Sequence, residues 1–442
     1  IASSIVYVTR NTENAITVPQ VEQGLNYTIV LKSDGTVWST GLNDVGQCGN
    51  GSSNTTSAEL TEVKINQDST LKNVVKISAG TSHVLALTKD GKVYSWGLNK
   101  FGQLGNGTTV NSKYAKEMLD TFGTDPITDI VDISASNGNS ILVDKYGNVY
   151  SCGYNVYGQL GDYTNTNRLL PVQTKEMQNV VQVSAGRWHA LMLRGDGTVW
   201  GIGRNYYGEL GINSTMTSSG SSDQGIRVAK QVMNENKDGV LKDITEIACG
   251  GWHSVALTTN KQVLTWGYGG NGQLGNKASS NISYPRFVLD NTDGLNGIGN
   301  IRKIGTSERI TFLITDDNEV LATGENSDYQ LSQNNNTDLL VVNKLYDYNG
   351  ENYICTYCKA KYEKETTTVK DNNTTVHTHT WDAGKVTTAP TCTTTGIKIY
   401  TCTSCGATRT ENIDKIEHDY NCEINHQIHK ILLHQSSYPA YP

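Results

Sequence analysis

The sequence has 442 residues, of which 44 are Gly and only 7 are Pro, and its formal net charge is −7. Gly exceeds its usual share of about 7% while Pro falls below about 5%, which excludes a collagen-like repeat and speaks against a disordered chain. The acidic balance, without a dense run of Lys and Arg, disfavours nucleic acid as a partner, and the absence of about 18 consecutive apolar residues argues against a membrane span.

The first 17 residues precede the repeated part of the chain. They begin at Ile1, with no initiator Met, basic region or apolar region of the kind found in signal peptides. We therefore expect residues 1–17 to be either the remnant of an upstream segment or a strand that closes the fold.

A unit of about 56 residues then recurs six times. Its most regular mark is a closing glycine: Gly41, Gly97, Gly153, Gly203, Gly267 and Gly324. In the second unit the apolar run 83–88, the turn Asp90-Gly91 and the alternating run 92–96 predict a β-hairpin. A third strand is expected at 74–78, and fourth strands of other units around Pro171 and 285–288. Four short strands per unit predict the blades of an all-β propeller, in which radial packing protects the sheet edges.

Three motifs recur in fixed order within the units. They are Ser-Ala-Gly-x-x-His at 78–83, Asp-Gly-x-Val-Tyr-x-x-Gly at 90–97 and Asn-x-x-Gly-Gln-Leu-Gly at 99–105. Together they resemble the repeat of the regulator of chromosome condensation family, and the resemblance, which covers residues 18–347, implies a seven-bladed propeller. The sixth copy is degenerate, with Ile310 in the His slot and Asn318 in the turn-glycine slot.

The number of blades stays open at this point. The ring either closes with six blades, or strands at 5–9 and 339–346 build a seventh, or an upstream unit is missing.

Several residue types recur in equivalent slots of the units. One slot holds His83, His189 and His253. Equivalent residues of different blades do not converge on one point, so we expect each His to form a hydrogen bond inside its own blade instead of binding metal or catalysing a reaction. The residues expected in the blade cores are Trp38, Trp96, Trp200, Trp266, Cys48, Cys152 and Cys249.

One slot, the second residue between Asn and Gly of the third motif, varies in chemistry. It holds Val45, Phe101, Tyr157, Tyr207, Asn271 and Asp328. Loop positions that repeat in space but differ in side chain can form a ring of contacts on one propeller face. The predicted partner-binding residues are Phe101, Tyr157, Tyr206, Tyr207 and Asn271. Packing between neighbouring blades is the alternative. Insertions at 108–129 and 212–242 add loop surface.

A segment rich in Cys and His, residues 348–422, follows the repeats. Two Cys-x-x-Cys pairs with intervening His and Cys are typical of structural zinc sites. The pattern also resembles a module of surface proteins from Gram-positive gut bacteria. The favoured ligands are His379, Cys392, Cys402 and Cys405. The alternative set is Cys355, Cys358, Cys402 and Cys405, and disulfides are the alternative chemistry. Residues 423–442 match no pattern.

No catalytic constellation is present in the sequence. We find no GxSxG elbow, HExxH motif or P-loop. The sequence therefore predicts a monomeric, non-enzymatic protein that presents propeller loops to a protein or glycan partner, exported to a bacterial cell surface or secreted. The family resemblance adds two alternatives, which are a guanine nucleotide exchange factor for a small GTPase and a secreted inhibitor of an enzyme.

Overall fold

A computed structural model describes residues 3–4, 16–216, 225–289, 297–331, 333 and 335–345, together with the short strands 351–354, 361–363, 385–388, 396–401 and 408–413. The chain divides into two compact units, Ile1–Leu345 and Tyr346–Pro442. Within the described residues there is no helix long and apolar enough to cross a membrane.

The first unit is a β-propeller of six four-stranded antiparallel blades in its described part. The first and second blades are β2 (Gln20–Gln23), β3 (Tyr27–Leu31), β4 (Val37–Leu42), β5 (Thr56–Glu62), and β6 (Val74–Ala79), β7 (His83–Thr88), β8 (Val93–Gly97), β9 (Ser112–Glu117). The third and fourth are β10 (Ile130–Ala135), β11 (Asn139–Asp144), β12 (Val149–Gly153), β13 (Arg168–Gln173), and β14 (Val180–Ala185), β15 (His189–Arg194), β16 (Val199–Gly203), β17 (Ile226–Gln231). The fifth and sixth are β18 (Ile244–Cys249), β19 (His253–Thr258), β20 (Val263–Gly267), β21 (Ile282–Phe287), and β22 (Ile301–Thr306), β23 (Ile310–Thr315), β24 (Val320–Gly324), β25 (Leu339–Lys344).

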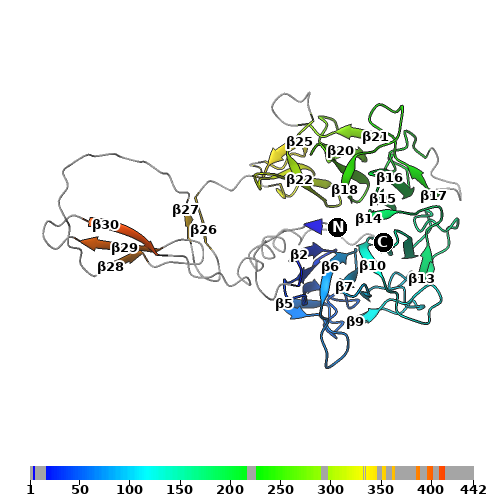
Figure 1. Ribbon diagram of the computed structural model, residues 1–442, viewed down its shortest axis with the longest axis horizontal. Coiled ribbons are helices and arrows are strands. Elements are labelled where there is room, and N and C mark those ends of the chain that lie inside the picture. The colour runs from blue at the N-terminus through cyan, green and yellow to red at the C-terminus, as the bar shows by residue number, and fades with distance from the viewer. Residues whose placement is uncertain are drawn as a thin grey trace. The chain divides into compact units, whose positions relative to one another are not determined.

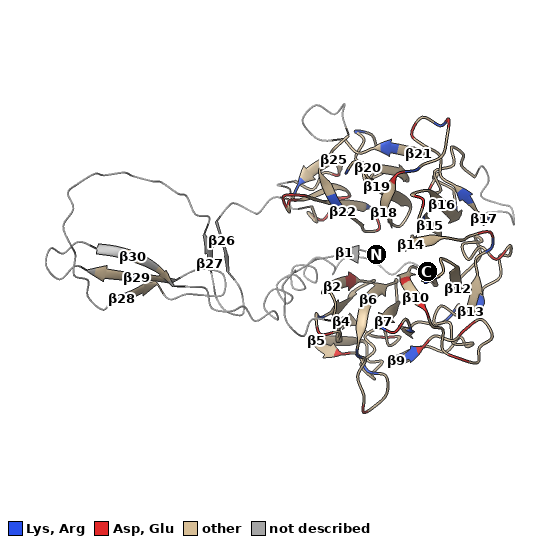
Figure 2. Ribbon diagram, viewed as in Figure 1, with Lys and Arg blue, Asp and Glu red and all other residues tan. Residues whose placement is uncertain are grey.

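The strands of each blade pair in chain order, which gives the propeller two distinct faces. The first strands lie around the centre of the ring and the fourth strands lie at its periphery (Figure 1). Because the strands are antiparallel, the loops after the first and third strands of every blade lie on one face, which we call face 1. The central hairpin turns and the links between blades lie on the other, face 2. Lys and Arg are interspersed with Asp and Glu around the ring (Figure 2).

The ring closes through a very short strand, β1 (Ser3–Ser4). It pairs antiparallel with β2 of the first blade and with β22 of the sixth, so both blades belong to one nine-stranded sheet. Strand β25 pairs with β24 as the fourth strand of the sixth blade. The alternative that residues 339–346 help to build a seventh blade was therefore wrong, because this segment completes the sixth. Residues 5–9 lie outside the described residues.

The hydrophobic core lies between neighbouring blades. One cluster, for example, joins Ile29 of the first blade to Val84 and Trp96 of the second. Trp96 and Trp266 are fully buried, whereas Trp38 and Trp200 are only half-buried. The last two stand at the second residue of a third strand, beside the hairpin turn, and Trp200 packs there against a core cluster. The prediction of core Trp residues was therefore correct for Trp96 and Trp266 and correct in part for Trp200.

The three cysteines of the propeller are buried and free. They are Cys48, Cys152 and Cys249. Burial raises the pKa of the Cys48 thiol to about 11 and that of the other two to about 12. Thiols with such pKa values are poor nucleophiles near neutral pH.

The recurring histidines connect blades. His83 Nε2 lies 3.0 Å from Ser140 Oγ of the next blade, and that hydroxyl donates to the Gln103 carbonyl at 2.7 Å. Because the Ser140 hydroxyl proton is used in this bond, His83 Nε2 must be the donor to Ser140. Burial lowers the pKa of His83 to about 3, so the imidazole is neutral. The same arrangement recurs from His189 to Ser254 and from His253 to Thr311. The prediction of bonds within each blade was wrong, because the nearest buried acceptor belongs to the following blade.

The described residues of the second unit form two small antiparallel sheets. β26 (Glu351–Ile354) pairs with β27 (Lys361–Glu363), and β28 (Lys385–Thr388), β29 (Gly396–Thr401) and β30 (Thr408–Ile413) form the other. Every predicted zinc ligand lies outside the described residues, so the zinc site stays a prediction. Among the residues that are described, no group of three or more His, Cys, Asp or Glu side chains could hold a metal ion.

Candidate functional site

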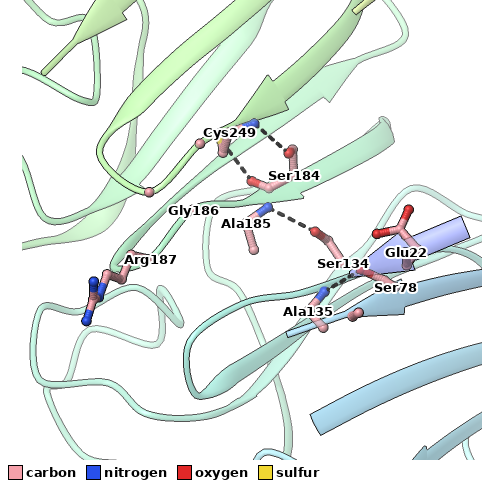
Figure 3. A pocket seen from close by; sticks show the side chains of 12 residues that line it. Glu22, Ser78, Ser134, Ala135, Ser184, Ala185, Gly186, Arg187 and Cys249 are labelled. Carbon is pink, nitrogen blue, oxygen red and sulfur yellow. Dashed lines mark hydrogen bonds between the residues drawn. The ribbon is translucent and has the colours of Figure 1, made fainter. Parts of the chain in front are cut away.

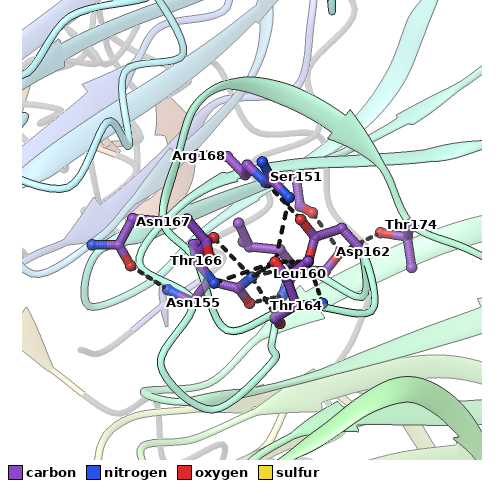
Figure 4. A network of polar contacts seen from close by, with 9 residues as sticks. All are labelled: Ser151, Asn155, Leu160, Asp162, Thr164, Thr166, Asn167, Arg168 and Thr174. Atoms are coloured by element: carbon purple, nitrogen blue, oxygen red, sulfur yellow. Dashed lines mark hydrogen bonds and ion pairs between the residues drawn. The ribbon is translucent and has the colours of Figure 1, made fainter.

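A buried asparagine fixes the loop after the third strand of a blade, which carries the variable slot. In the third blade Asn155 Oδ1 accepts the Leu160 N–H at 3.0 Å, and its Nδ2 donates to the carbonyls of Thr164 and Thr166 at 3.1 and 3.0 Å (Figure 4). The same acceptor bond is made by Asn43, Asn99, Asn205 and Asn326. These bonds order the loop backbone before any partner arrives.

The glutamine of the third motif fixes the variable residue itself. Gln159 Oε1, for example, accepts the backbone N–H of Tyr157 at 3.0 Å. In the fourth blade a glutamate, Glu209, makes this bond to Tyr207 N–H at 2.7 Å. The variable side chains therefore project from a backbone held in one conformation.

Six aromatic side chains from the third, fourth and fifth blades form a continuous series of ring contacts on face 1. We call Tyr157, Trp188, Tyr206, Tyr207, Trp252 and Tyr268 the aromatic cluster. Ring centroids are 5.7 Å apart for Tyr157–Trp188, 6.3 Å for Trp188–Trp252, 5.9 Å for Trp252–Tyr268, 4.9 Å for Tyr268–Tyr207 and 5.0 Å for Tyr207–Tyr206. The rings meet because loops after first strands and loops after third strands share this face.

Three arginines lie over these rings. The Arg204 guanidinium is 4.8 Å from the Trp188 centroid and 4.9 Å from that of Tyr207, and it also lies over Tyr157 and Tyr206. The other two contact the tryptophans: Arg187 lies over Trp188 and Trp252, and Arg309 lies over Trp252. Such cation–π contacts are each worth about 0.5–2 kcal/mol. They hold in place arginine side chains that come from the fourth and sixth blades.

An acidic residue accompanies each arginine. Arg309 Nη1 is 2.8 Å from Glu325, and Arg204 Nη1 is 3.9 Å from Glu209. Arg187 of the fourth blade pairs with Glu308 of the sixth, over Gly251 of the fifth. A Cβ at Gly251 would lie 2.7 Å from Glu308 Cγ, so this glycine makes room for the ion pair.

A small polar pocket lies at the centre of the ring, and Arg187 is part of its lining. Ser78, Ser134 and Ser184 line it on three consecutive first strands, and each hydroxyl accepts an N–H from the next blade (Figure 3). Glu22 is buried there, and burial raises its pKa to about 8. The pocket encloses about 40 Å³, which suits a few water molecules at most.

The structure brings together only some of the predicted partner-binding residues. Tyr157, Tyr206 and Tyr207 lie in the aromatic cluster. Phe101 instead contacts Tyr154 of the next blade, with centroids 4.8 Å apart. Asn271 Nδ2 donates to Asp338 of the sixth blade at 2.9 Å. These last two contacts join neighbouring blades, as does the Tyr207–Tyr268 contact within the aromatic cluster.

Sequence reasoning missed half of the aromatic cluster and all of its arginines. Trp188 and Trp252 directly precede the recurring His, in the two unspecified positions of the first motif. Those positions vary from unit to unit as strongly as the variable slot of the third motif. They also hold Arg187 and Arg309. This variation from unit to unit could have marked both positions as candidate binding residues.

Comparison with known proteins agrees with the architecture. A model of the RCC1-like domain matches residues 5–238, and models of the regulator of chromosome condensation (RCC1) repeat match residues 244–273 and 261–314. The chain is 30% identical over 267 residues to the Protein RCC2 homolog of Danio rerio, covering 59% of this chain and 44% of that protein. It is 31% identical over 301 residues to the E3 ubiquitin-protein ligase HERC2 of Homo sapiens, covering 68% of this chain and 6% of that one. The chain thus spans less than half of either relative.

Solved propellers have the same fold. Human WBSCR16 superposes with a TM-score of 0.61 at 23% identity, covering 74% of this chain and 82% of that one. Prp20p from Saccharomyces cerevisiae, a protein described by its binding to Gsp1p and histones, gives a TM-score of 0.61 at 19% identity, covering 76% and 78%. The domain model covers more than half of the residues, and the chain therefore belongs to the RCC1-like domain family.

Proposed function

We propose that the propeller is a non-enzymatic binding module whose partner is a protein that docks on the aromatic cluster and its three arginines. The observation that carries this proposal is the gathering of Tyr, Trp and Arg side chains from several blades on one face. These residue types dominate the binding energy of protein interfaces. Their loops are held by buried hydrogen bonds, so little conformational entropy is lost when a partner binds.

A protein partner fits this face better than a glycan. Sugars bind aromatic side chains by stacking on an open ring face, whereas guanidinium groups already lie over Trp188, Trp252 and Tyr207. Arginines held in this way offer N–H groups to carboxylates or backbone carbonyls of a protein. The description of yeast Prp20p by its binding to Gsp1p and histones supports the same choice. The exchange-factor and inhibitor alternatives rest on resemblance alone, and export to a cell surface stays a prediction from the sequence.

The test compares two surface variants of the full chain. The first carries Tyr157→Ala, Trp188→Ala and Tyr207→Ala, and the matched control carries Phe122→Ala and Tyr146→Ala, which remove exposed rings outside the cluster. Proteins captured from an extract of the source organism are identified, and the affinity of each is measured. Truncation of a central interface residue costs about 2 kcal/mol of binding free energy, so we expect at least about 30-fold weaker binding by the first variant.

The control variant is expected to bind normally. Equal binding by both variants, with both shown to be folded by circular dichroism, would contradict the proposed site. Binding to a glycan array that the cluster variant loses would replace the protein partner with a carbohydrate.

A further inference from the structure

The fourth blade differs from the others at one buried position. The slot that holds Glu209 holds glutamine elsewhere: Gln47, Gln103, Gln159, Gln273 and Gln330. In each case one side-chain oxygen accepts the N–H of the variable residue. The Nε2 atoms of Gln103, Gln159 and Gln273 are buried and have no hydrogen-bond partner among the described residues. The slot therefore suits a neutral side chain with one accepting oxygen.

Glu209 fills this slot with a carboxyl group. Its Oε2 accepts the Tyr207 N–H at 2.7 Å, and its Oε1 lies 3.9 Å from Arg204 Nη1. The Glu209 side chain is 1% exposed and that of Arg204 is 13% exposed. Arg204 is equally specific to this blade, because its slot elsewhere holds Leu42, Leu98, Tyr154, Tyr268 and Glu325.

The pair can exist in two forms that differ by one proton. Protonated Glu209 has the shape and neutrality of glutamine and needs no counter-charge. Ionised Glu209 is a buried charge that requires Arg204 beside it. Burial raises the pKa of Glu209 to about 7, against the opposing effects of Arg204 and of the N–H groups of Tyr207 and Gly208. Both forms are thus populated near neutral pH.

Among the described residues, Arg204 is the only charged side chain near the Glu209 carboxyl group. His189 and His253 stand on the strands behind it, and burial lowers the pKa of each to about 3, so both are neutral. Ser254 and Trp266 donate to the Glu209 carbonyl. On the outer side Arg204 faces the rings of Tyr157, Trp188, Tyr206 and Tyr207, while Arg187 and Arg309 lie over Trp252.

We propose that the protonation state of Glu209 sets the position of Arg204 and so regulates partner binding at the aromatic cluster, a role that rests on the proposed function. Ionised Glu209 holds Arg204 among the four rings and preforms the face. Protonation removes the negative charge beside Arg204 and leaves its guanidinium held by the ring contacts alone. The partner is therefore expected to bind more weakly as the pH falls below neutrality.

The first test needs no partner, because Trp188 reports on Arg204. Tryptophan fluorescence of the full chain is titrated from pH 5.5 to 8.5. We expect a transition near pH 7 that Glu209→Gln abolishes. Glu22→Gln, which removes another buried glutamate, is the matched control and should leave this transition in place. Identical titrations of the unaltered chain and Glu209→Gln would overturn the proposal.

Thermal stability gives a second measurement, with a sign fixed by the pKa. The ordinary pKa of glutamate is 4.5, and that of folded Glu209 is about 7. Between these values the folded chain retains a proton that the unfolded chain has lost, so the free energy of unfolding falls as the pH rises and levels off above pH 7. Glu209→Gln should therefore raise the melting temperature at pH 8 and leave it unchanged at pH 4.5. An equal shift at both pH values would contradict the proton linkage.

Partner binding separates the two proposals. Once a partner is captured, its affinity is measured at pH 6 and pH 8 for the unaltered chain and for Glu209→Gln. A pH dependence that disappears in the variant supports the regulation. Binding at the cluster without pH dependence overturns the regulation but leaves the proposed function standing. If the fluorescence transition is present but the partner binds the cluster variant as tightly as the unaltered chain, the proposed function is overturned. The titration of Glu209 then still stands.

Discussion

His83 and Ser140 show how single residues hold neighbouring blades together. The imidazole donates to the hydroxyl, and the hydroxyl donates to a carbonyl of the blade that contains the histidine. A neutral pair of this kind satisfies three buried polar groups at once. Tyr27 connects the first two blades in a similar way, because its hydroxyl donates to the Gly80 carbonyl of the second blade at 2.7 Å.

Removing the shared hydroxyl should destabilise the propeller. In Ser140→Ala the His83 N–H loses its acceptor inside the core, which costs about 1–3 kcal/mol of the free energy of unfolding. Chemical denaturation measures this loss, with the exposed Ser53→Ala as the control, for which a change within about 0.5 kcal/mol is expected. A loss for Ser140→Ala no larger than that of the control would contradict the role of the bridge.

At this scale the sequence revealed residue types but not their contacts. The recurrence of His indicated burial, yet its partner lies more than fifty residues away in the next blade. Similarly, the variable slot pointed to Tyr157 and Tyr207, whereas Trp188 joins them only because loops after first strands and loops after third strands share face 1. Such proximity depends on the arrangement of whole blades and is not encoded in any local pattern.

At the scale of elements, the hairpin turns were the most predictable feature. Gly91 has φ +81°, as its position in an Asp-Gly turn requires, and its carbonyl accepts the N–H of Ile130 from the next blade. In the degenerate sixth unit Asn318 adopts φ +66° in the same slot, a conformation that Asn tolerates better than most residues. The residue types at the turn determine its conformation, so the positions of the turns could be predicted from the sequence.

Substitution of the turn glycine tests that conclusion. Gly91→Ala should lower the free energy of unfolding by about 1–2 kcal/mol, since a Cβ is disfavoured at positive φ and would lie 3.1 Å from the Asp129 nitrogen. Gly299→Ala is the matched control, because a Cβ there meets nothing within 4 Å. Denaturant titration compares them, and similar losses in both variants would argue against conformational strain as the cause.

At the scale of the whole molecule, β1 joins the first and sixth blades. Six repeats and their four-stranded character could be predicted from the sequence. A closing strand within residues 1–17 was one of two alternatives there, but its position and its pairing partners could not be predicted. A strand of two residues has no periodicity to detect, and its pairing with β2 and β22 is determined only when both blades are in place.

A variant that lacks residues 1–4 should loosen this junction. Each lost backbone hydrogen bond contributes roughly 0.5–1.5 kcal/mol, so we expect a total loss of about 1–3 kcal/mol. Amide hydrogen exchange should accelerate in β2 and β22 and stay unchanged in β10 and β11, which serve as internal controls. Uniform protection across all four strands would show that the ring closes without β1.

The position of β1 also determines the order in which the propeller can assemble. Successive blades can contact each other soon after each is synthesised, because every bridge from a recurring His reaches only to the next unit. The pairing of Ser3 with Thr306, by contrast, must wait until almost the entire propeller exists. Closing so long a loop is slow and entropically costly. Until that step the inner edges of the first and sixth blades remain unpaired, and folding of this chain is most exposed to mispairing at that moment.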